Sequence, residues 1–447
     1  MYPYIKEFIS RPTYYDRIEP FINTDIIKVI VGQRRVGKSY LLFEIMSKLL
    51  EKNSKVDIIY INKENLEFDS IKTYDDLYTY IKNNKSGNGK CYVFIDEIQD
   101  IVEWEKAVRS LFAVGGYDIY ITGSNARLLS SELATYLSGR YIEFKVHGLS
   151  YPEFLEFHKL DESSAAFEKF YKYGGLPYLS NLQLNERLVY EYTKSTYNSI
   201  VLKDVVERHN IRNVRMLHDL TTYMADNIGT PFSATRISMF LKSQRIDLSP
   251  KVILEYLQCL ESAFIIKRVK RTDIKGKKIF EINEKYFFED LGIRNSIVAL
   301  RKTDIARILE NVVYQHLIYK GYEVYIGKLG EKEIDFVADR YGERVYIQVT
   351  YIMTEEKTIE REIGNLLEIK DNYPKIVVMM DESESASYKG IELIGIRRFL
   401  TKWENHESKE TALVVSEPIE KFETNTDYFF ERYQSQLDTL KTFHANE

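Results

Sequence analysis

The stretch IIKVIVGQRRVGKSYLLFEI, residues 26–45, decides the fold of the first part of the chain. An apolar, β-branched run over residues 26–31 is typical of a buried strand. The next eight residues, Gly32 to Ser39, match the pattern GxxxxGK[ST] at every fixed position, and apolar residues at helical spacing follow from Leu41. The strand, loop and helix together predict an α/β fold built on a parallel sheet with a phosphate-binding loop.

Each fixed position of this loop has a physical reason. Two glycines allow the backbone to curl so that its N–H groups point at phosphate oxygens, and the helix N-terminus adds partial positive charge. Lys38 is expected to bridge the β- and γ-phosphates of ATP, and the Ser39 hydroxyl to bind Mg²⁺. Arg34 and Arg35 either add charge to the site or face solvent, and solvent is favoured. The predicted cofactor-binding residues are Gly32, Gln33, Arg34, Arg35, Val36, Gly37, Lys38, Ser39 and Tyr40.

A second motif, CYVFIDEIQD at residues 91–100, supplies two carboxylates. Its apolar run predicts a buried parallel strand, and the acidic pair falls at the carboxyl end, where α/β sheets place their ligands. Asp96 suits a role in holding Mg²⁺, and Glu97 suits polarisation of the attacking water. The alternative, an acidic pair on the surface, rarely follows a fully apolar strand.

The next predicted strand, within YDIYITGSNARLL at residues 117–129, contributes a polar side chain to the same edge. Asn125 is expected to orient water beside the γ-phosphate, although Thr122 or Ser124 could do the same. Arg140, in LSGR, is either a cation aimed at the γ-phosphate or a surface residue paired with a carboxylate. The predicted catalytic residues are therefore Glu97, Asn125 and Arg140, and the predicted metal ligands are Ser39 and Asp96.

These motifs, with LSYPEFLEF after them, resemble the AAA-type P-loop ATPases of bacteria and archaea that have a C-terminal domain of unknown function. The resemblance continues through GGLPYL, VLKDVVERHNIRN, YFFEDLGIRN, LENVVYQHLIYKGYEVYIG and EIDFVADRYGERVYIQVT, and spans about residues 10–400. It implies ATP binding and hydrolysis. The predicted domains are the ATPase domain (1–150), a helical lid (151–213), a winged helix (214–285), a degenerate restriction-endonuclease-like module (286–400) and a polar tail with one amphipathic helix (401–447).

The predicted winged helix suggests a DNA partner, because its hairpin is basic. Seven basic residues stand against Asp273 between residues 267 and 278, and such a cluster could follow phosphates. Glu255 and Glu261 on the preceding helix oppose contact with a major groove. The basic residues are Lys267, Arg268, Lys270, Arg271, Lys275, Lys277 and Lys278.

The last module resembles a metal-dependent nuclease that has lost its chemistry. Glu310 and Asp335 are present, but Gln348 and Thr350 stand where a metal-binding Glu and a Lys would be. An uncharged carboxamide binds a divalent metal far less well than a carboxylate does. A role in hydrogen bonding that orders the hairpin is the simpler reading of Glu310 and Asp335.

Composition restricts the remaining possibilities. The chain has 447 residues, a net charge of -5 and only two cysteines, Cys91 and Cys259, which predict buried thiols. It lacks an apolar run of the roughly 18 residues that a membrane helix needs, which predicts a cytoplasmic protein. The sequence thus predicts an ATPase whose C-terminal half contacts DNA or protein. A protein-interaction switch without DNA binding is the alternative, and a metal-dependent nuclease is the less favoured third.

Overall fold

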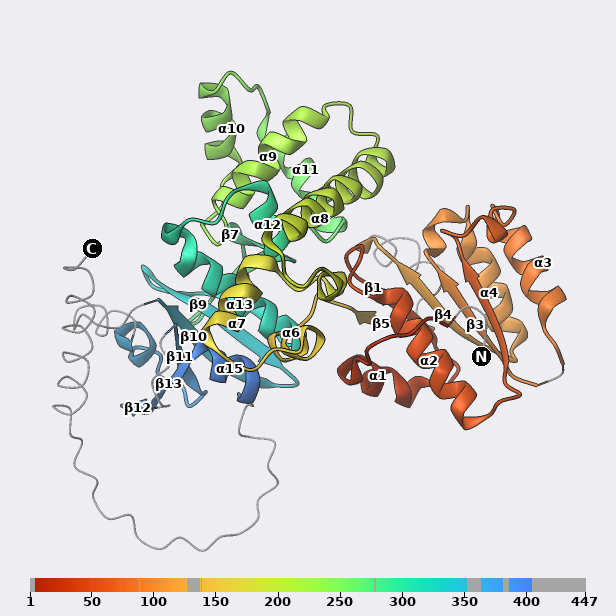
Figure 1. Ribbon diagram of the computed structural model, residues 1–447. Helices are drawn as coiled ribbons and strands as arrows, with labels where there is room; N and C mark the ends of the chain where they lie inside the picture. The colour runs from red at the N-terminus through yellow and green to blue at the C-terminus, as the bar shows by residue number, and fades with distance from the viewer. Residues whose placement is uncertain are drawn as a thin grey trace, which may run out of the picture.

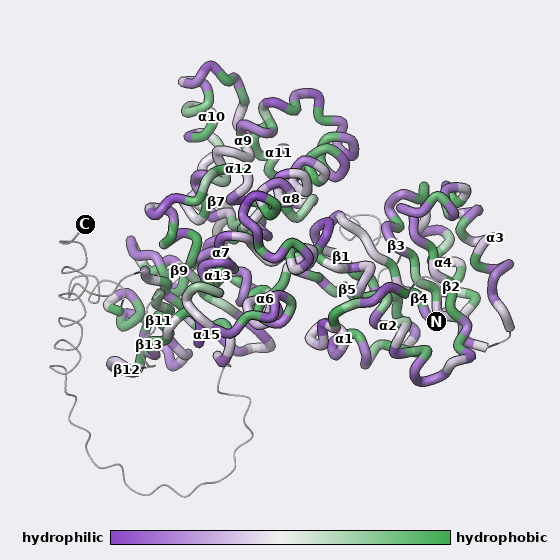
Figure 2. Tube along the Cα trace, in the orientation of Figure 1, coloured by the Kyte–Doolittle hydropathy of each residue, from purple (hydrophilic) through white to green (hydrophobic). Residues whose placement is uncertain are grey.

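The protein is described by a computed structural model that covers residues 5–87, 89–126, 137, 139–276, 279–351, 363–380 and 386–403. Figure 1 shows two lobes, each built around one β-sheet, with the helices α9, α10 and α11 projecting from the C-terminal lobe. Hydrophobic residues follow the strands of both sheets, whereas the outer helix α3 is mainly hydrophilic (Figure 2). Within the described residues, no helix combines the length and apolar character that a membrane crossing requires.

The N-terminal sheet is parallel and has the order β2-β3-β4-β1-β5. Residues of β1 and β3 are buried throughout, as expected for strands covered on both faces. Its strands are β1 (Ile27–Val31), β2 (Asp57–Asn62), β3 (Cys91–Asp96), β4 (Tyr117–Gly123) and β5 (Tyr141–Lys145). The helices beside them are α1 (Pro12–Ile18), α2 (Lys38–Lys52), α3 (Tyr74–Asn84) and α4 (Trp104–Val114). The predicted strand, loop and helix at residues 26–45 therefore form as expected.

A helical segment connects the two sheets. Its first helix begins at a capping box, in which the Ser150 hydroxyl and the Glu153 carboxylate each bind the other's backbone N–H. The helices are α6 (Tyr151–His158), α7 (Ser164–Tyr173), η5 (Pro177–Leu182), α8 (Glu186–Ser199) and the π-helical η6 (Ile200–Glu207). Because η6 continues α8 directly, these 22 residues form one long rod that ends beside the phosphate-binding loop.

The C-terminal half begins with the helices α9, α10 and α11 and continues with an eight-stranded sheet of order β12-β13-β11-β10-β9-β8-β6-β7, whose strands alternate with further helices. The helices are α9 (Val214–Asp226), α10 (Ala234–Ser243), α11 (Pro250–Ser262), α12 (Leu291–Ile297), α13 (Ile305–Tyr319) and α15 (Ile396–Lys402). The strands are β6 (Ile266–Asp273), β7 (Ile279–Phe288), β8 (Glu323–Leu329), β9 (Lys332–Arg340), β10 (Glu343–Thr350), β11 (Lys375–Met379), β12 (Ala386–Tyr388) and β13 (Ile391–Gly395).

The predicted wing does not stand apart from the module that follows it. Its strands β6 and β7 pair with each other, and β6 also pairs in parallel with β8, with Arg271 opposite Ile326. The boundary predicted after residue 285 thus falls inside β7, and one sheet serves both predicted modules. The predicted tail lies outside the described residues from residue 404 onward.

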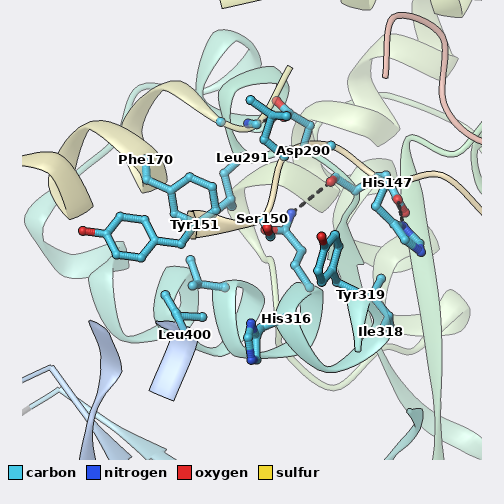
Figure 3. A pocket seen from close by; sticks show the side chains of 17 residues that line it. His147, Ser150, Tyr151, Phe170, Asp290, Leu291, His316, Ile318, Tyr319 and Leu400 are labelled. Atoms are coloured by element: carbon cyan, nitrogen blue, oxygen red, sulfur yellow. Dashed lines mark hydrogen bonds and ion pairs between the residues drawn. The ribbon is translucent and has the colours of Figure 1, made fainter. Parts of the chain in front are cut away.

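The two lobes meet at a cavity lined by segments that are distant in the sequence (Figure 3). His147 pairs with Glu289 across it, and the backbone N–H of Gly175 donates to Asp290 at 2.8 Å. Burial raises the pKa of Asp290 to about 6, although backbone N–H groups oppose the shift. Three of the motifs quoted above, LSYPEFLEF, GGLPYL and YFFEDLGIRN, therefore have a shared structural role at this joint.

Buried His316, on α13 beside this cavity, predicts acid sensitivity. Burial lowers its pKa to about 3, whereas a histidine in an unfolded chain titrates near 6.5. As the pH falls below about 6.5, this histidine binds a proton in the unfolded state but not in the folded state. Protonation therefore stabilises the unfolded state, and the free energy of unfolding decreases. Between pH 7.5 and 5 we expect His316 to cost about 2 kcal/mol of unfolding free energy. Urea denaturation at both pH values checks this, and equal losses in wild type and His316→Leu would contradict it.

Candidate nucleotide-binding site

The phosphate-binding loop joins β1 to α2 in a conformation that requires its glycines. A Cβ on Gly32 would lie 2.1 Å from the backbone oxygen of Val146, which is too close for any side chain. Gly37 has φ 98° and is the N-cap of α2. The Lys38 Nζ donates to the carbonyl oxygens of Gly32 and Gln33, at 3.1 Å each. The lysine is thus held at the mouth of the loop by its own backbone.

The two carboxylates of β3 lie next to this lysine. Glu97 Oε1 is 3.6 Å from Lys38 Nζ. Burial raises the pKa of Asp96, while hydrogen bonds from Ser39 and Thr122 oppose the shift. A buried carboxylate in contact with the Ser39 hydroxyl is a suitable set of oxygen donors for Mg²⁺, whose charge would offset the cost of burial. Ser39 and Asp96, the predicted metal ligands, are brought together.

Glu97 is held in a left-handed conformation, with φ 58°. Its backbone N–H donates to the Thr122 hydroxyl at 3.0 Å, and this hydroxyl in turn donates to Asp96. Burial disfavours the ionised carboxylate, but the charges of Lys38 and then Arg34 outweigh burial and lower the pKa of Glu97. Glu97 is therefore an ionised hydrogen-bond acceptor beside the phosphate-binding loop.

Residues that follow β4 complete this edge of the sheet. Ser124 and Asn125 are both buried there. The Gln99 side-chain amide donates to the carboxylate of Glu97 and, at 3.5 Å, to the Ser124 hydroxyl. Three residues were considered for orienting water. Thr122 and Ser124 form hydrogen bonds with other groups of this site, and Asn125 directly follows Ser124.

Arg140 lies at the amino ends of the strands, whereas the phosphate-binding loop lies at their carboxyl ends. It precedes β5, whose Tyr141 is in register with Ile27 at the start of β1, whereas the loop follows Val31 at the end of β1. The two ends of the strands are four residues apart, which corresponds to a distance of about 13 Å. Arg140 is exposed, and its guanidinium lies 5.8 Å from the ring centre of Phe112. Within one chain, therefore, Arg140 is not aimed at the phosphate-binding loop.

Arg34 differs from the expectation that it faces solvent. Its guanidinium pairs with Asp204 of η6 at 3.0 Å and with Glu64 at 2.8 Å, and only 12% of its side chain is exposed. Its neighbour Arg35 is exposed, as expected. The Gln33 amide donates to the backbone oxygen of Phe264 at 2.8 Å. Two residues of the loop thus contact the second half of the chain.

Arg11 is a further residue that sequence reasoning missed. Its guanidinium donates to the backbone oxygen of Val36 in the loop at 3.0 Å and to those of His147 and Gly148 at 3.1 Å. It also forms a two-bond pair with Glu153, at 2.8 and 2.9 Å. Arg11 therefore ties the loop to the joint between the lobes. The only signal in the sequence was its position at the start of the resemblance.

A second charged cluster lies in the C-terminal sheet. Lys285 Nζ on β7 is 3.1 Å from Glu310 of α13 and 3.0 Å from Glu333 of β9. Asp335 accepts from the backbone N–H of Val349 at 2.8 Å, which ties β9 to β10. Among the described residues, no group of three or more His, Cys, Asp or Glu side chains could hold a metal ion.

Three of the five basic residues that the structure describes on the hairpin are paired within the protein. Lys267 lies 3.9 Å from Glu289, Arg268 lies 3.8 Å from Glu261, and Arg271 pairs with Glu333. Lys277 and Lys278 lie outside the described residues. Charges that are already paired add less to the attraction of phosphates.

Comparison with known proteins gives matches over most of the chain. Residues 24–155 match the family described as AAA domain, and residues 164–304 match a domain of unknown function (DUF8612). An uncharacterized protein of Haemophilus influenzae is 39% identical over 395 residues, 87% of this chain and 98% of that protein. One of Methanocaldococcus jannaschii is 33% identical over 358 residues, 75% of this chain and 77% of that protein. The solved structure of Aeropyrum pernix Orc1 in complex with DNA has 12% identity and a TM-score of 0.32, covers 69% of this chain and 97% of that chain, and is too distant to support an inference.

Proposed function

Because the chain belongs to the family of its Haemophilus influenzae and Methanocaldococcus jannaschii relatives and its residues 24–155 form an AAA domain, we propose that it binds ATP with Mg²⁺ and hydrolyses the ATP. One observation supports this most strongly. Two separate motifs bring four residues together at the carboxyl ends of β1 and β3. These residues are Lys38, Ser39, Asp96 and Glu97. The set contains a phosphate-binding cation, oxygen ligands for a hard metal and an ionised base.

Each of these residues has a role in the proposed reaction. The loop N–H groups and Lys38 bind the β- and γ-phosphates, and Ser39 and Asp96 hold Mg²⁺, which neutralises charge on the phosphates when bound. Glu97 accepts a proton from water, whose oxygen forms a bond to the γ-phosphorus. The bond from that phosphorus to the bridging oxygen breaks, and ADP leaves with the electron pair. Asn125 orients the water through its amide.

We further propose that nucleotide state is transmitted to the C-terminal half, which acts as an interaction module. The contacts of Gln33 and Arg34 with Phe264 and Asp204 support such transmission. A protein partner is favoured over duplex DNA, because three of the five described basic residues of the hairpin are already paired. In addition, Met239, Phe240 and Leu254 expose apolar surface on α10 and α11, which suits protein contact better than a phosphate backbone.

Steady-state ATP hydrolysis by the full chain tests the proposal. We expect Mg²⁺-dependent turnover that Lys38→Ala abolishes and that duplex DNA changes less than about 2-fold at low salt, where phosphate contacts are strongest. Strong stimulation by DNA would favour the DNA-dependent ATPase instead. Wild-type turnover no higher than that of Lys38→Ala would overturn the assignment as an ATPase.

A further inference from the structure

We propose that Arg34 supplies, within the same chain, the cation that stabilises the γ-phosphate during hydrolysis, and that Asp204 from the connecting helical segment holds it in place. The inference rests on the proposed ATP hydrolysis and identifies a residue for a role that Arg140 does not fill within one chain. It makes catalysis in the N-terminal lobe depend on a side chain about 170 residues away in sequence.

The three guanidinium nitrogens of Arg34 pair with two carboxylates that differ in exposure. Its Nε and Nη2 donate to the two carboxylate oxygens of Asp204, at 3.0 and 3.1 Å. Such a two-bond pair fixes the plane as well as the position of the group. The remaining nitrogen, Nη1, donates to Glu64, whose side chain is 52% exposed. An exposed carboxylate is easily exchanged for a phosphate oxygen, whereas the fully buried Asp204 is not.

Arg34 is close to the reacting groups. It belongs to the loop that would surround the phosphates and precedes Lys38 by four residues. Asp204 accepts a hydrogen bond from Ser124 at 3.2 Å, and Ser124 is linked through Gln99 to Glu97. The arginine, its carboxylate partner and the proposed base are therefore members of one hydrogen-bonded network at the carboxyl ends of β3 and β4.

The helical segment that connects the two sheets determines where Asp204 lies. Asp204 is on η6, and π-helical segments are rare and often occur at functional sites. Beside it, Phe264 inserts into the core beneath the N-terminal sheet with φ 55°, an uncommon conformation for a bulky residue. Its backbone oxygen accepts the hydrogen bond from Gln33. A movement of the C-terminal half that withdrew η6 would release Arg34 and slow hydrolysis.

Kinetics of full-length variants test the inference. An arginine that stabilises the transferred phosphate contributes about 10³-fold or more to kcat, so we expect a loss of this size in Arg34→Ala. The Kd for ADP should change less than about 3-fold, because ADP lacks the phosphate that this arginine contacts. Asp204→Asn should lower kcat about 10-fold, and the double variant should be no slower than Arg34→Ala alone. Arg187→Ala, which removes an exposed pair with Glu191 on α8, is the matched control and should leave both values unchanged.

The outcomes separate this inference from the proposed function. A wild type that binds neither ADP nor ATP refutes the function itself. A wild type that turns over ATP, with Arg34→Ala equally fast or with losses that multiply in the double variant, refutes the inference alone. If the wild type binds nucleotide without turnover, Arg34→Ala must reduce the preference for a non-hydrolysable ATP analogue over ADP, and an unchanged preference refutes the inference. If Arg34→Ala does not fold, Arg34→Lys decides, and full activity refutes the inference.

Discussion

Replacing Glu97 with Gln is expected to lower kcat for ATP about 10³-fold while ATP remains bound, since a positioned general base contributes roughly 10²–10⁴-fold. The amide keeps the shape of the side chain but cannot accept the proton from water. In the wild type, Glu97 also attracts Lys38 across 3.6 Å. Removing that charge frees the lysine for phosphate, so affinity for ATP should stay the same or increase. Single-turnover hydrolysis and equilibrium binding of ATP measure the two effects separately.

Glu103→Gln provides the matched control for Glu97→Gln. Glu103 also has a left-handed backbone, with φ 54°, and also precedes a helix, but its exposed carboxylate pairs with Lys106. We expect its kcat and ATP affinity to equal those of the wild type. A Glu97→Gln variant that hydrolyses ATP at the wild-type rate would show that another group activates the water, and Asn125 would then be the first residue to test.

The candidate nucleotide site of the N-terminal sheet was largely predictable because its information is local. Each motif places its polar residues directly after an apolar strand, and parallel strands bring their carboxyl ends together. The same rule explains why, of the two alternatives left open for Arg140, the structure of one chain does not favour a cation aimed at the γ-phosphate. Arg140 follows a glycine and precedes a strand, so it belongs to the amino end of β5. Its distance in sequence from Asn125 does not indicate at which end of the strands it lies.

The contacts between the lobes could not be predicted, because they join residues that sequence patterns do not relate. Asp204 lies in the predicted helical lid and Phe264 in the predicted winged helix, and neither prediction indicates a partner in the phosphate-binding loop. The hairpin of β6 and β7 was recognisable from its alternation of apolar and polar residues. Its pairing with β8 was not, since a parallel neighbour some 50 residues further along leaves no local signal.

The lysine at the centre of the C-terminal carboxylate cluster was missed for the same reason. The nuclease pattern places its lysine at the position of Thr350, whereas Lys285 enters the cluster from β7, a strand on the far side of β8 and β6 in the sheet order. Burial alone would lower the pKa of Lys285, but the surrounding carboxylates outweigh burial and raise it. Its ammonium group therefore stands as a fixed cation among Glu310, Glu333 and Asp335, the place where a nuclease of this fold would need a metal.

Replacing Lys285 with Met is accordingly expected to destabilise the protein by about 3 kcal/mol, because it leaves the partly buried carboxylates of Glu310 and Glu333 without their cation. Burial already raises the pKa of Glu310, and loss of the lysine would raise it further. When the pKa of a carboxyl group is raised in the folded state, the free energy of unfolding of the protein decreases as the pH rises toward that pKa. The defect should therefore be larger at pH 7 than at pH 5, which urea denaturation at the two pH values measures.

Lys332→Met is the control for Lys285→Met. Lys332 lies on β9 of the same sheet, and it pairs with Glu368 on the exposed surface. Solvent screens such a pair, so we expect a much smaller loss that hardly depends on pH. Adding Glu310→Gln to Lys285→Met should recover part of the stability, because one unpaired charge is removed. Equal losses in the two lysine variants would mean that the cluster is already neutralised in some other way. Stabilisation of the wild type by Mg²⁺ through this cluster would reopen the possibility of a metal-dependent nuclease, which the position of Lys285 argues against.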